Sequence, residues 1–266
     1  SIGNYVALVF PKFLLNTPEF SQTRKYLSDK AVECIIDFGE KGFPGVLVET
    51  LAIFINNLSR PSNTRVASIT HGKFMIQSQK YIFDDKLPYW IIYRDNEFDS
   101  VCKNLDFNVF KVFRDRQITN KLLSPSGDIR VLKSRNISDD GKNVMDIDGY
   151  DSYISYDDAK NLSVYSYLDC DNVYLTPNMT YKPRMIEKPK ECLVNGSLAV
   201  LIPKKGIIPT KEQLAFFSTQ EYRNFYQIAR NFQTRSLNVD ACSVFFYGLL
   251  RDKAKKSPIT EKLDEK

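Results

Sequence analysis

Residues 5–10, YVALVF, constrain the fold of this chain more than any other segment. An uninterrupted apolar run of this length is typical of a strand in a parallel sheet, which is covered on both faces. The sequence Asn16-Thr17-Pro18 then predicts the start of a helix, with Thr17 as its N-cap and Pro18 at its first position. Spacings of three and four residues predict the helix face that packs on the sheet: Phe20, Thr23 and Leu27.

Two further apolar runs, residues 32–38 and 46–55, predict two more strands of the same sheet. Residues 1–58 therefore form an α/β pattern, but only part of one. A unit of this size cannot cover its own first strand, and the sequence opens directly before that strand without an initiator methionine. We expect a fragment whose N-terminal partner is not included in this chain.

The remaining sequence predicts a second class of fold, α+β. Residues 59–105 are expected to form a connector with antiparallel strands and a short helix near residues 97–105. Residues 106–255 are expected to form a mixed domain whose short strands are separated by Gly, Pro and Asn turns. The expected strands of that domain are IRVLKS, NVYLTP, LAVLIP and SVFFYGLL. Residues 256–266 lose their apolar content and are expected to be a disordered tail.

Two capping-box spacings predict helices late in the chain, one from Thr210 and Gln213 and one from Ser218 and Glu221. The second helix carries one apolar face: Tyr222, Phe225, Ile228, Ala229 and Phe232. Two interpretations of its aromatic residues are open, a buried core or a platform for stacking bases. The core is favoured, because aromatic stripes at helical spacing usually pack inside a protein.

Composition and charge limit the cellular setting and the partners. The five cysteines stand apart without a CxxC pair, which favours free thiols in a reducing cytoplasm over disulfides or a zinc site. No apolar run approaches the roughly 20 residues that cross a bilayer, so no membrane partner is expected. Residues 139–158 hold seven aspartates and one lysine, whereas residues 173–255 hold thirteen Lys+Arg against six Asp+Glu. This sorting fits a face that binds a polyanion, and it also fits an ordinary solvated surface.

Several enzyme classes leave no motif in this sequence. A GxGxxG nucleotide loop, a Walker lysine loop and a GxSxG elbow are all missing from it. The one histidine, His71, stands in a turn-like Thr-His-Gly sequence, which disfavours a catalytic role. The acidic segment DIDGYDSYISYDD has the wrong glycine position for a calcium loop, so we expect a solvated acidic face there.

One loop carries an unusual residue. Phe43 stands between Gly42 and Pro44-Gly45, in a connection between two strands that should be exposed to water. The ring either folds back as a plug over the sheet edge or waits for a partner that binds from outside. The residues alone favour the plug.

The residues around this loop resemble a known family. The strand ending in VFP, the helix LLNTPEFSQTRKYL, the loop IIDFGEKGFPG and the strand VETLAIFI are similar to the second half of the catalytic domain in gamma-class (TaqI-type) N6-adenine DNA methyltransferases. These are enzymes of type II restriction–modification systems. The resemblance implies that residues 1–58 are the last strands of a Rossmann-like sheet that binds S-adenosylmethionine. It also implies that Phe43 stacks on an adenine swung out of the duplex, and it shifts the preference from plug to stacking.

The resemblance also implies what this chain lacks. The glycine-rich turn that holds S-adenosylmethionine and the Asn-Pro-Pro-Tyr loop that grips the adenine precede the matching region in the family, and neither occurs here. We therefore expect a full-length enzyme that uses S-adenosylmethionine. This fragment alone should bind no cofactor, hold no catalytic residue and be inactive.

The second half of the chain is similar to the target-recognition domains of such enzymes and, more distantly, to type I specificity subunits. The segments that carry this likeness begin at FRDRQITNK, NVYLTPNMTYKPR and FFSTQEYRNFY. Double-stranded DNA is the implied partner, with a restriction endonuclease as a further one. Arg and Asn can read base edges and Lys can contact phosphates. The candidate residues are Arg114, Arg116, Arg135, Asn136, Tyr181, Lys182, Arg184, Lys204, Arg235 and Asn238.

Two alternatives remain open at this stage. A non-catalytic DNA-specificity subunit would share the recognition domain but would not need the Phe43 loop. A scaffold that binds only proteins would need neither, and for any single basic residue a salt bridge is as good an explanation as a base contact.

Overall fold

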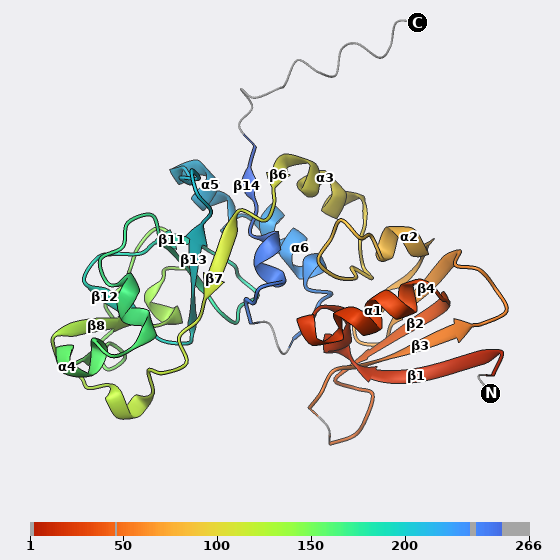
Figure 1. The fold of residues 1–266 in the computed structure, drawn as a ribbon, viewed down its shortest axis with the longest axis horizontal. Coiled ribbons are helices and arrows are strands. Elements are labelled where there is room, and N and C mark those ends of the chain that lie inside the picture. The colour runs from red at the N-terminus through yellow and green to blue at the C-terminus, as the bar shows by residue number, and fades with distance from the viewer. Residues whose placement is uncertain (1–2, 46, 235–237, 252–266) are drawn as a thin grey trace, which may run out of the picture.

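Five strands from the first third of the chain form one sheet, in the order β1-β3-β2-β4-β5 (Figure 1). The computed structural model describes residues 3–45, 47–234 and 238–251. The expected tail at residues 256–266 lies outside these ranges. The strands are β1 (Tyr5–Pro11), β2 (Ala31–Gly39), β3 (Thr50–Asn56), β4 (Asn63–Ser68) and β5 (Phe74–Ser78).

Strand β1 lies at the edge of this sheet. It runs parallel to β2, but β3 lies between them and pairs antiparallel with both. Within the described ranges β1 pairs with β3 alone, and its side chains Tyr5 and Val9 are 68% and 55% exposed. The prediction of a strand covered on both faces is therefore wrong for these residues, because only one face of the sheet carries a covering layer.

The covered face of the sheet packs against the segment that crosses from β1 to β2. This segment forms two 3-10 turns before α1 (Ser21–Ser28) begins, so the helix starts later than Thr17 and Pro18 predict. Thr17 makes no side-chain cap hydrogen bond. Leu27 of α1 is buried, as the helical spacing predicts, and it packs in one core with Ile35 and Ile53.

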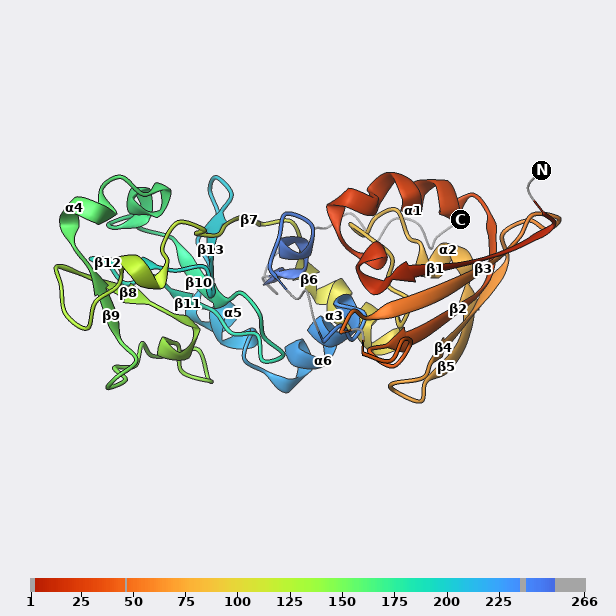
Figure 2. The same cartoon turned by 90° about the horizontal axis from the view of Figure 1, so that it is seen from below.

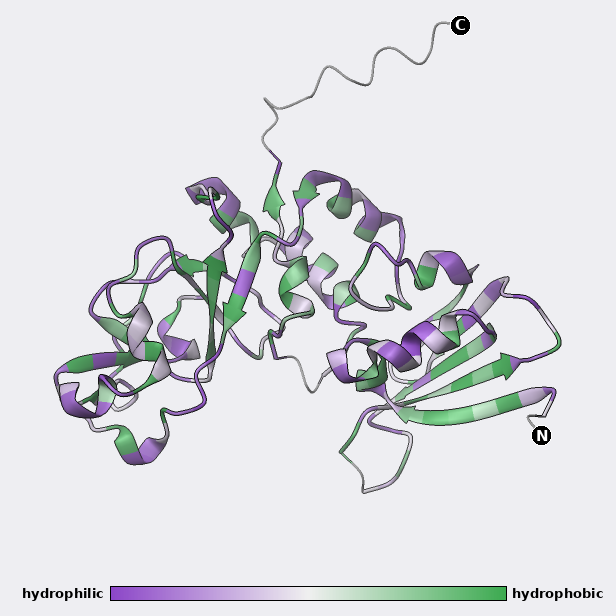
Figure 3. Cartoon of the chain, in the orientation of Figure 1, coloured by the Kyte–Doolittle hydropathy of each residue, from purple (hydrophilic) through white to green (hydrophobic). Residues whose placement is uncertain are grey.

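The strands of this sheet are rich in hydrophobic residues (Figure 3). Its opposite face, which we call the open face, exposes apolar side chains. Side chains alternate between the two faces of a strand. Each exposed residue of the open face is therefore next in sequence to a residue that points to the covered face. The open face consists of Tyr5, Val9, Phe54, Phe74 and Ile76.

The predicted connector is not a separate element. Strand β4 pairs parallel with β2, and β5 pairs antiparallel with β4, so both extend the first sheet. The apolar segment after β5 turns into the short helix α2 (Gln79–Ile82) instead of continuing as a strand. The cause is Gln79, whose buried side chain bonds the backbone of Val32 and Lys30 at 2.8 Å each. Helix α3 (Asn96–Asn104) then forms where the sequence predicts it.

A second unit contains two small sheets around a core of its own. One sheet has the order β11-β10-β13-β7, and the other has the order β12-β8-β9. The elements are β7 (Phe110–Phe113), β8 (Ile129–Leu132), β9 (Ser152–Ile154), α4 (Tyr156–Ala159), β10 (Tyr174–Pro177), β11 (Ile186–Glu187), β12 (Cys192–Val194) and β13 (Leu198–Pro203). The three strands predicted at residues 129–203 are thus present.

The last helices belong to the larger hydrophobic core, and α6 lies between the two units whereas α5 lies beside the sheet of the second unit (Figure 2). They are α5 (Lys211–Phe216) and α6 (Gln220–Ala229), and β14 (Leu249–Leu250) pairs with β6 (Leu105–Asp106). Tyr222 and Phe225 of α6 are fully buried, which confirms the prediction of a core face.

Three local predictions in this region need correction. The Thr210–Gln213 capping box forms, but α6 is capped by Thr219 instead of Ser218, because the Thr219 side chain accepts from the N–H of Tyr222. Phe232 lies beyond the end of α6, at a left-handed φ of 51°. The predicted strand SVFFYGLL is mostly a 3-10 turn, because Asp240 Oδ1 accepts hydrogen bonds from the N–H groups at its start.

Every helix within the described ranges falls short of the length and apolar content that crossing a membrane requires.

Candidate nucleic-acid interface

The Phe43 loop, which the structure describes at residues 40–45 and 47–49, projects from one end of the first sheet, at the bottom of Figure 1. Phe43 is 46% exposed and lies outside the hydrophobic core formed by the described residues, so it does not plug the sheet edge. Leu47 and Val48 of the same loop are also exposed. The loop stem is tight, because a Cβ on Gly42 would lie 2.3 Å from Thr50 Oγ1. Leu47 and Val48 were expected to lie in a strand, because they stand in the apolar run of residues 46–55.

A buried ionic cluster lies at the base of the Phe43 loop, where the loop leaves β2 and enters β3. Lys12 Nζ lies 2.7 Å from Asp37 Oδ2 and 3.7 Å from Glu49 Oε1, and all three side chains are buried. The Tyr93 hydroxyl donates to Asp37 Oδ2 at 2.5 Å, and burial beside that carboxylate raises the pKa of Tyr93. The cluster therefore joins the two stems of the loop to Lys12, the residue that follows β1. No motif in the sequence predicts this cluster.

Two arginines flank a fixed turn at the end of β7 in the second unit. The buried Asp115 carboxylate accepts hydrogen bonds from the N–H groups of Gln117 and Ile118, at 3.2 and 2.8 Å, and so holds the turn. Arg114 and Arg116 lie on either side of Asp115, one half-buried and one exposed. Burial and the neighbouring charge of Arg116 lower the pKa of Arg114.

These arginines, like Arg60 and Arg223, have no ion pair among the described residues, although the charge of Asp240 acts on Arg114. In the part of the chain that the structure describes, neither Arg114 nor Arg116 makes a hydrogen bond or ion pair. By contrast, Arg94, Arg130 and Arg251 each lie within 2.9 Å of an aspartate oxygen. Arg116, which is exposed and makes no such contact, is available to an anionic ligand such as a phosphate, and the half-buried Arg114 lies beside it in the sequence.

A segment after α6 connects the Phe43 loop with the strand ends of the second unit. Thr234 N donates to both carboxylate oxygens of Glu49 at 3.1 Å, and Thr234 Oγ1 lies 2.9 Å from Glu40 Oε1. The Tyr181 hydroxyl donates to Thr234 O. Further along, the Asn178 amide donates to Asn238 Oδ1 at 2.9 Å. Thr234 therefore links the Phe43 loop to the segment that follows β10, and Asn178 at the start of that segment is bonded to Asn238.

The turn that carries Arg114 and Arg116 belongs to the same surface. The Asn178 amide also donates to Gly196 O at 3.0 Å. A Cβ on Gly196 would lie 2.8 Å from Asp115 O, so the turn packs against this glycine. Arginines, asparagines and an exposed aromatic loop thus come together from four separate parts of the sequence.

The structure places the other predicted DNA-binding residues in different settings. Arg135 is exposed and lies 4.8 Å from the Tyr150 ring, and Lys182 is exposed beside Asp139. Tyr181 is half-exposed but uses its hydroxyl within the protein. Arg235 lies outside the described residues.

Three of the predicted residues are not presented on this surface. Asn136 is fully buried, and its side-chain amide bonds Met145 O and Asp151. Arg184 donates to three backbone carbonyls, and its burial lowers its pKa. Lys204 follows the end of β13 that pairs with Phe110, so it lies at the end of the sheet opposite Arg114. We leave these three out of the proposed contacts.

Comparison with known proteins adds a weak structural likeness. No protein-family model and no curated protein matches the sequence. Two solved restriction–modification enzymes resemble the chain. The type IIG restriction endonuclease BpuSI matches with a TM-score of 0.37 and 10% identity over 96% of this chain and 41% of its own.

The second structure is the type IIL restriction-modification enzyme MmeI in complex with DNA. It matches with a TM-score of 0.41 and 10% identity over 93% of this chain and 38% of its own. The chain thus spans about two-fifths of the length of either enzyme. Likeness at this level identifies neither the fold nor the function, so the proposal below rests on the residues of this chain.

Proposed function

We propose that this chain is the DNA-recognition part of a site-specific N6-adenine DNA methyltransferase from a restriction–modification system. Phe43 is the wall on which the extrahelical adenine stacks. Arg114, Arg116, Arg135 and Lys182 contact the duplex. One observation carries the proposal: an exposed aromatic loop and unpaired arginines share one hydrogen-bonded surface through Thr234 and Asn178. Stacking and phosphate contact are the two interactions that an extrahelical base and its flanking duplex require.

S-adenosylmethionine, which the proposed reaction needs, does not fit the residues of this chain. The described sheet ends in the Phe43 loop and in a buried ionic cluster, and neither offers the glycine-rich turn on which a nucleotide backbone can lie. The cofactor and the groups that hold the adenine amino nitrogen belong to the part of the enzyme that precedes this chain. We therefore derive no methyl-transfer step from these residues.

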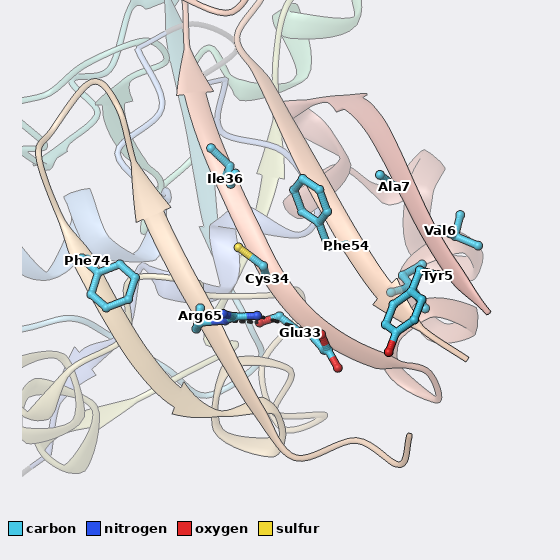
Figure 4. Close-up of a pocket in the computed structure, with 10 residues that line it drawn as sticks. Tyr5, Val6, Ala7, Glu33, Cys34, Ile36, Phe54, Arg65 and Phe74 are labelled. Carbon is cyan, nitrogen blue, oxygen red and sulfur yellow. Dashed lines mark hydrogen bonds and ion pairs between the residues drawn. The ribbon is translucent and has the colours of Figure 1, made fainter. Parts of the chain in front are cut away.

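That preceding part is also the proposed occupant of the open face (Figure 4). The face forms a hollow of about 530 Å³ between strands, lined by residues such as Tyr5, Phe54 and Phe74, and next to it β1 presents an unpaired edge. An exposed apolar edge strand promotes aggregation in a finished protein, whereas it is ordinary in one piece of a larger sheet. The Glu33–Arg65 pair at 3.9 Å is the charged pair in the hollow.

The open face gives a first prediction. In the full-length protein, Phe74→Lys is expected to lower the free energy of unfolding by about 2–3 kcal/mol, because a buried aromatic ring is lost and a charge is placed in an apolar contact. Ile208→Lys is the matched control, because Ile208 is even more exposed and lies in the second unit, away from the sheet. Urea unfolding measures both variants. Equal, small effects of about 0.5 kcal/mol or less would show that nothing covers the open face.

DNA binding gives a second prediction. Arg116→Ala should weaken binding of the full-length protein to its duplex about tenfold or less and reduce the slope of log K against log salt by about 1, because one cationic contact is lost. Arg251→Ala removes the same charge from an arginine that is paired with Asp106, so it should leave the slope unchanged. Fluorescence anisotropy at several salt concentrations measures both.

The two rival functions, a protein scaffold and a non-catalytic specificity subunit, predict different results for the same two variants. A protein scaffold would bind duplex DNA weakly and with the same slope in both variants. A non-catalytic specificity subunit would show the Arg116 effect but would cause no distortion at a target adenine.

A further inference from the structure

We infer that Thr234 is a positioning residue. It couples the second unit, which holds the proposed DNA contacts, to the Phe43 loop. This inference rests on the proposed function and deepens it. Thr234 is one residue with three hydrogen-bonding groups, and each group is used on a different segment: its N–H, its hydroxyl and its carbonyl. It touches neither base nor cofactor in the proposal, so its effect acts through the loop.

Two of these groups hold the two stems of the Phe43 loop. The N–H of Thr234 donates to Glu49, on the strand side of the loop, and its hydroxyl bonds Glu40, on the other stem. The sequence separations are 185 and 194 residues, so no local turn produces these contacts. Charge-assisted hydrogen bonds of this kind are stronger than neutral ones and fix geometry as well.

The third hydrogen-bonding group of Thr234, its carbonyl, contacts the second unit. The carbonyl of Thr234 accepts a hydrogen bond from the Tyr181 hydroxyl, in the segment that follows β10. Lys182, a proposed DNA contact, is the next residue, and Asn178 at the start of this segment is bonded to Asn238. We call residues 178–182 the β10 segment. When contact with DNA moves the β10 segment, Thr234 moves with it.

The base of the loop is held by the buried ionic cluster, so a movement of Thr234 shifts the loop as a whole. Glu49 lies beside Lys12, which is also bound to Asp37 on the other stem, and Tyr93 donates to the same aspartate. Both stems are thus anchored to one buried cluster, so a shift at Glu40 and Glu49 changes the position of the loop tip. We infer that a correct duplex at the β10 segment favours the loop position that stacks the adenine.

The decisive experiment compares Thr234→Val with Thr234→Ser in the full-length protein. Valine keeps the shape and the backbone N–H but removes the bond to Glu40, whereas serine keeps the hydroxyl. The substrate is a duplex with 2-aminopurine at the methylated position, whose fluorescence rises when the base leaves the stack. Thr234→Val is expected to reduce kcat and the fluorescence rise by about threefold to tenfold, with the KM for duplex unchanged, because a single hydrogen bond to a charged group is lost. Thr234→Ser is expected to restore both values.

A second measurement does not depend on methylation. Amide hydrogen exchange of residues 40–49 should be faster in Thr234→Val than in Thr234→Ser, both with and without DNA. Equal exchange in the two variants, or equal kcat in two variants that both methylate, would overturn the coupling. If the wild-type protein shows no methylation and no fluorescence rise while exchange still differs between the variants, the proposed function fails and the coupling stands.

Discussion

Replacing Lys12 with methionine is expected to lower the free energy of unfolding by about 3–5 kcal/mol, the range for breaking a buried ion pair by removing one partner. Lys12 is 1% exposed and is the cation that the structure places between the buried carboxylates of Asp37 and Glu49. Methionine fills similar space but leaves both carboxylates without their cation. Urea unfolding at neutral pH measures the loss.

The matched control is Lys41→Met on the exposed part of the Phe43 loop, which should change stability by no more than about 0.5 kcal/mol. The double variant Lys12→Met/Asp37→Asn should be more stable than Lys12→Met alone, because it removes one of the stranded charges. A Lys12→Met variant as stable as Lys41→Met would contradict the assignment of this cluster as the anchor of the loop.

Phe43→Ala is expected to reduce methylation by the full-length enzyme about 10- to 100-fold, which corresponds to the loss of roughly 1–3 kcal/mol of base stacking. Duplex affinity should stay within about twofold, because the contacts to the backbone are made elsewhere. Methyl-transfer kinetics, fluorescence of 2-aminopurine at the target position and anisotropy measure the three quantities.

Two further variants separate stacking from a general effect on the loop. Phe43→Trp should retain most of the activity, since it keeps an aromatic face. Leu47→Ala removes another exposed apolar side chain from the same loop and should cost little. Normal turnover in Phe43→Ala would remove Phe43 from the site, and an equal loss in Leu47→Ala would point to loop packing instead of stacking.

Local structure followed from the sequence wherever neighbouring residues decide it. The helix at Asn96–Asn104, the Thr210–Gln213 capping box and three of the four strands expected in the second half of the chain form as the pattern predicts. The pattern failed where a side-chain hydrogen bond redirects the backbone. Gln79 bonds the distant backbone of Val32 where the chain leaves β5 and enters α2. Asp240 acts locally, because its carboxylate accepts from the N–H groups of Cys242 and Ser243 at the start of a 3-10 turn.

The candidate site was only partly accessible from the sequence. Phe43 was visible because Gly and Pro surround it, which marks a loop where an apolar ring has no local reason to stand. The sequence could not show which polar candidates are available to DNA. It does not distinguish an arginine on the surface from an arginine whose side chain bonds backbone carbonyls. Only burial and hydrogen bonds distinguish the exposed Arg116 from Arg184, which bonds three carbonyls.

The sequence by itself determined the alternation of strands and helices, the exposed aromatic loop and the surplus of cations in the second half. These features depend on side-chain period and turn chemistry, which act over a few residues. The tertiary structure decided which segments meet: the edge position of β1, the Lys12 cluster and the contacts of Thr234 with Glu40, Glu49 and Tyr181. Such contacts join residues up to 194 positions apart, and the free energy that selects them comes from burial and hydrogen bonding of the whole fold.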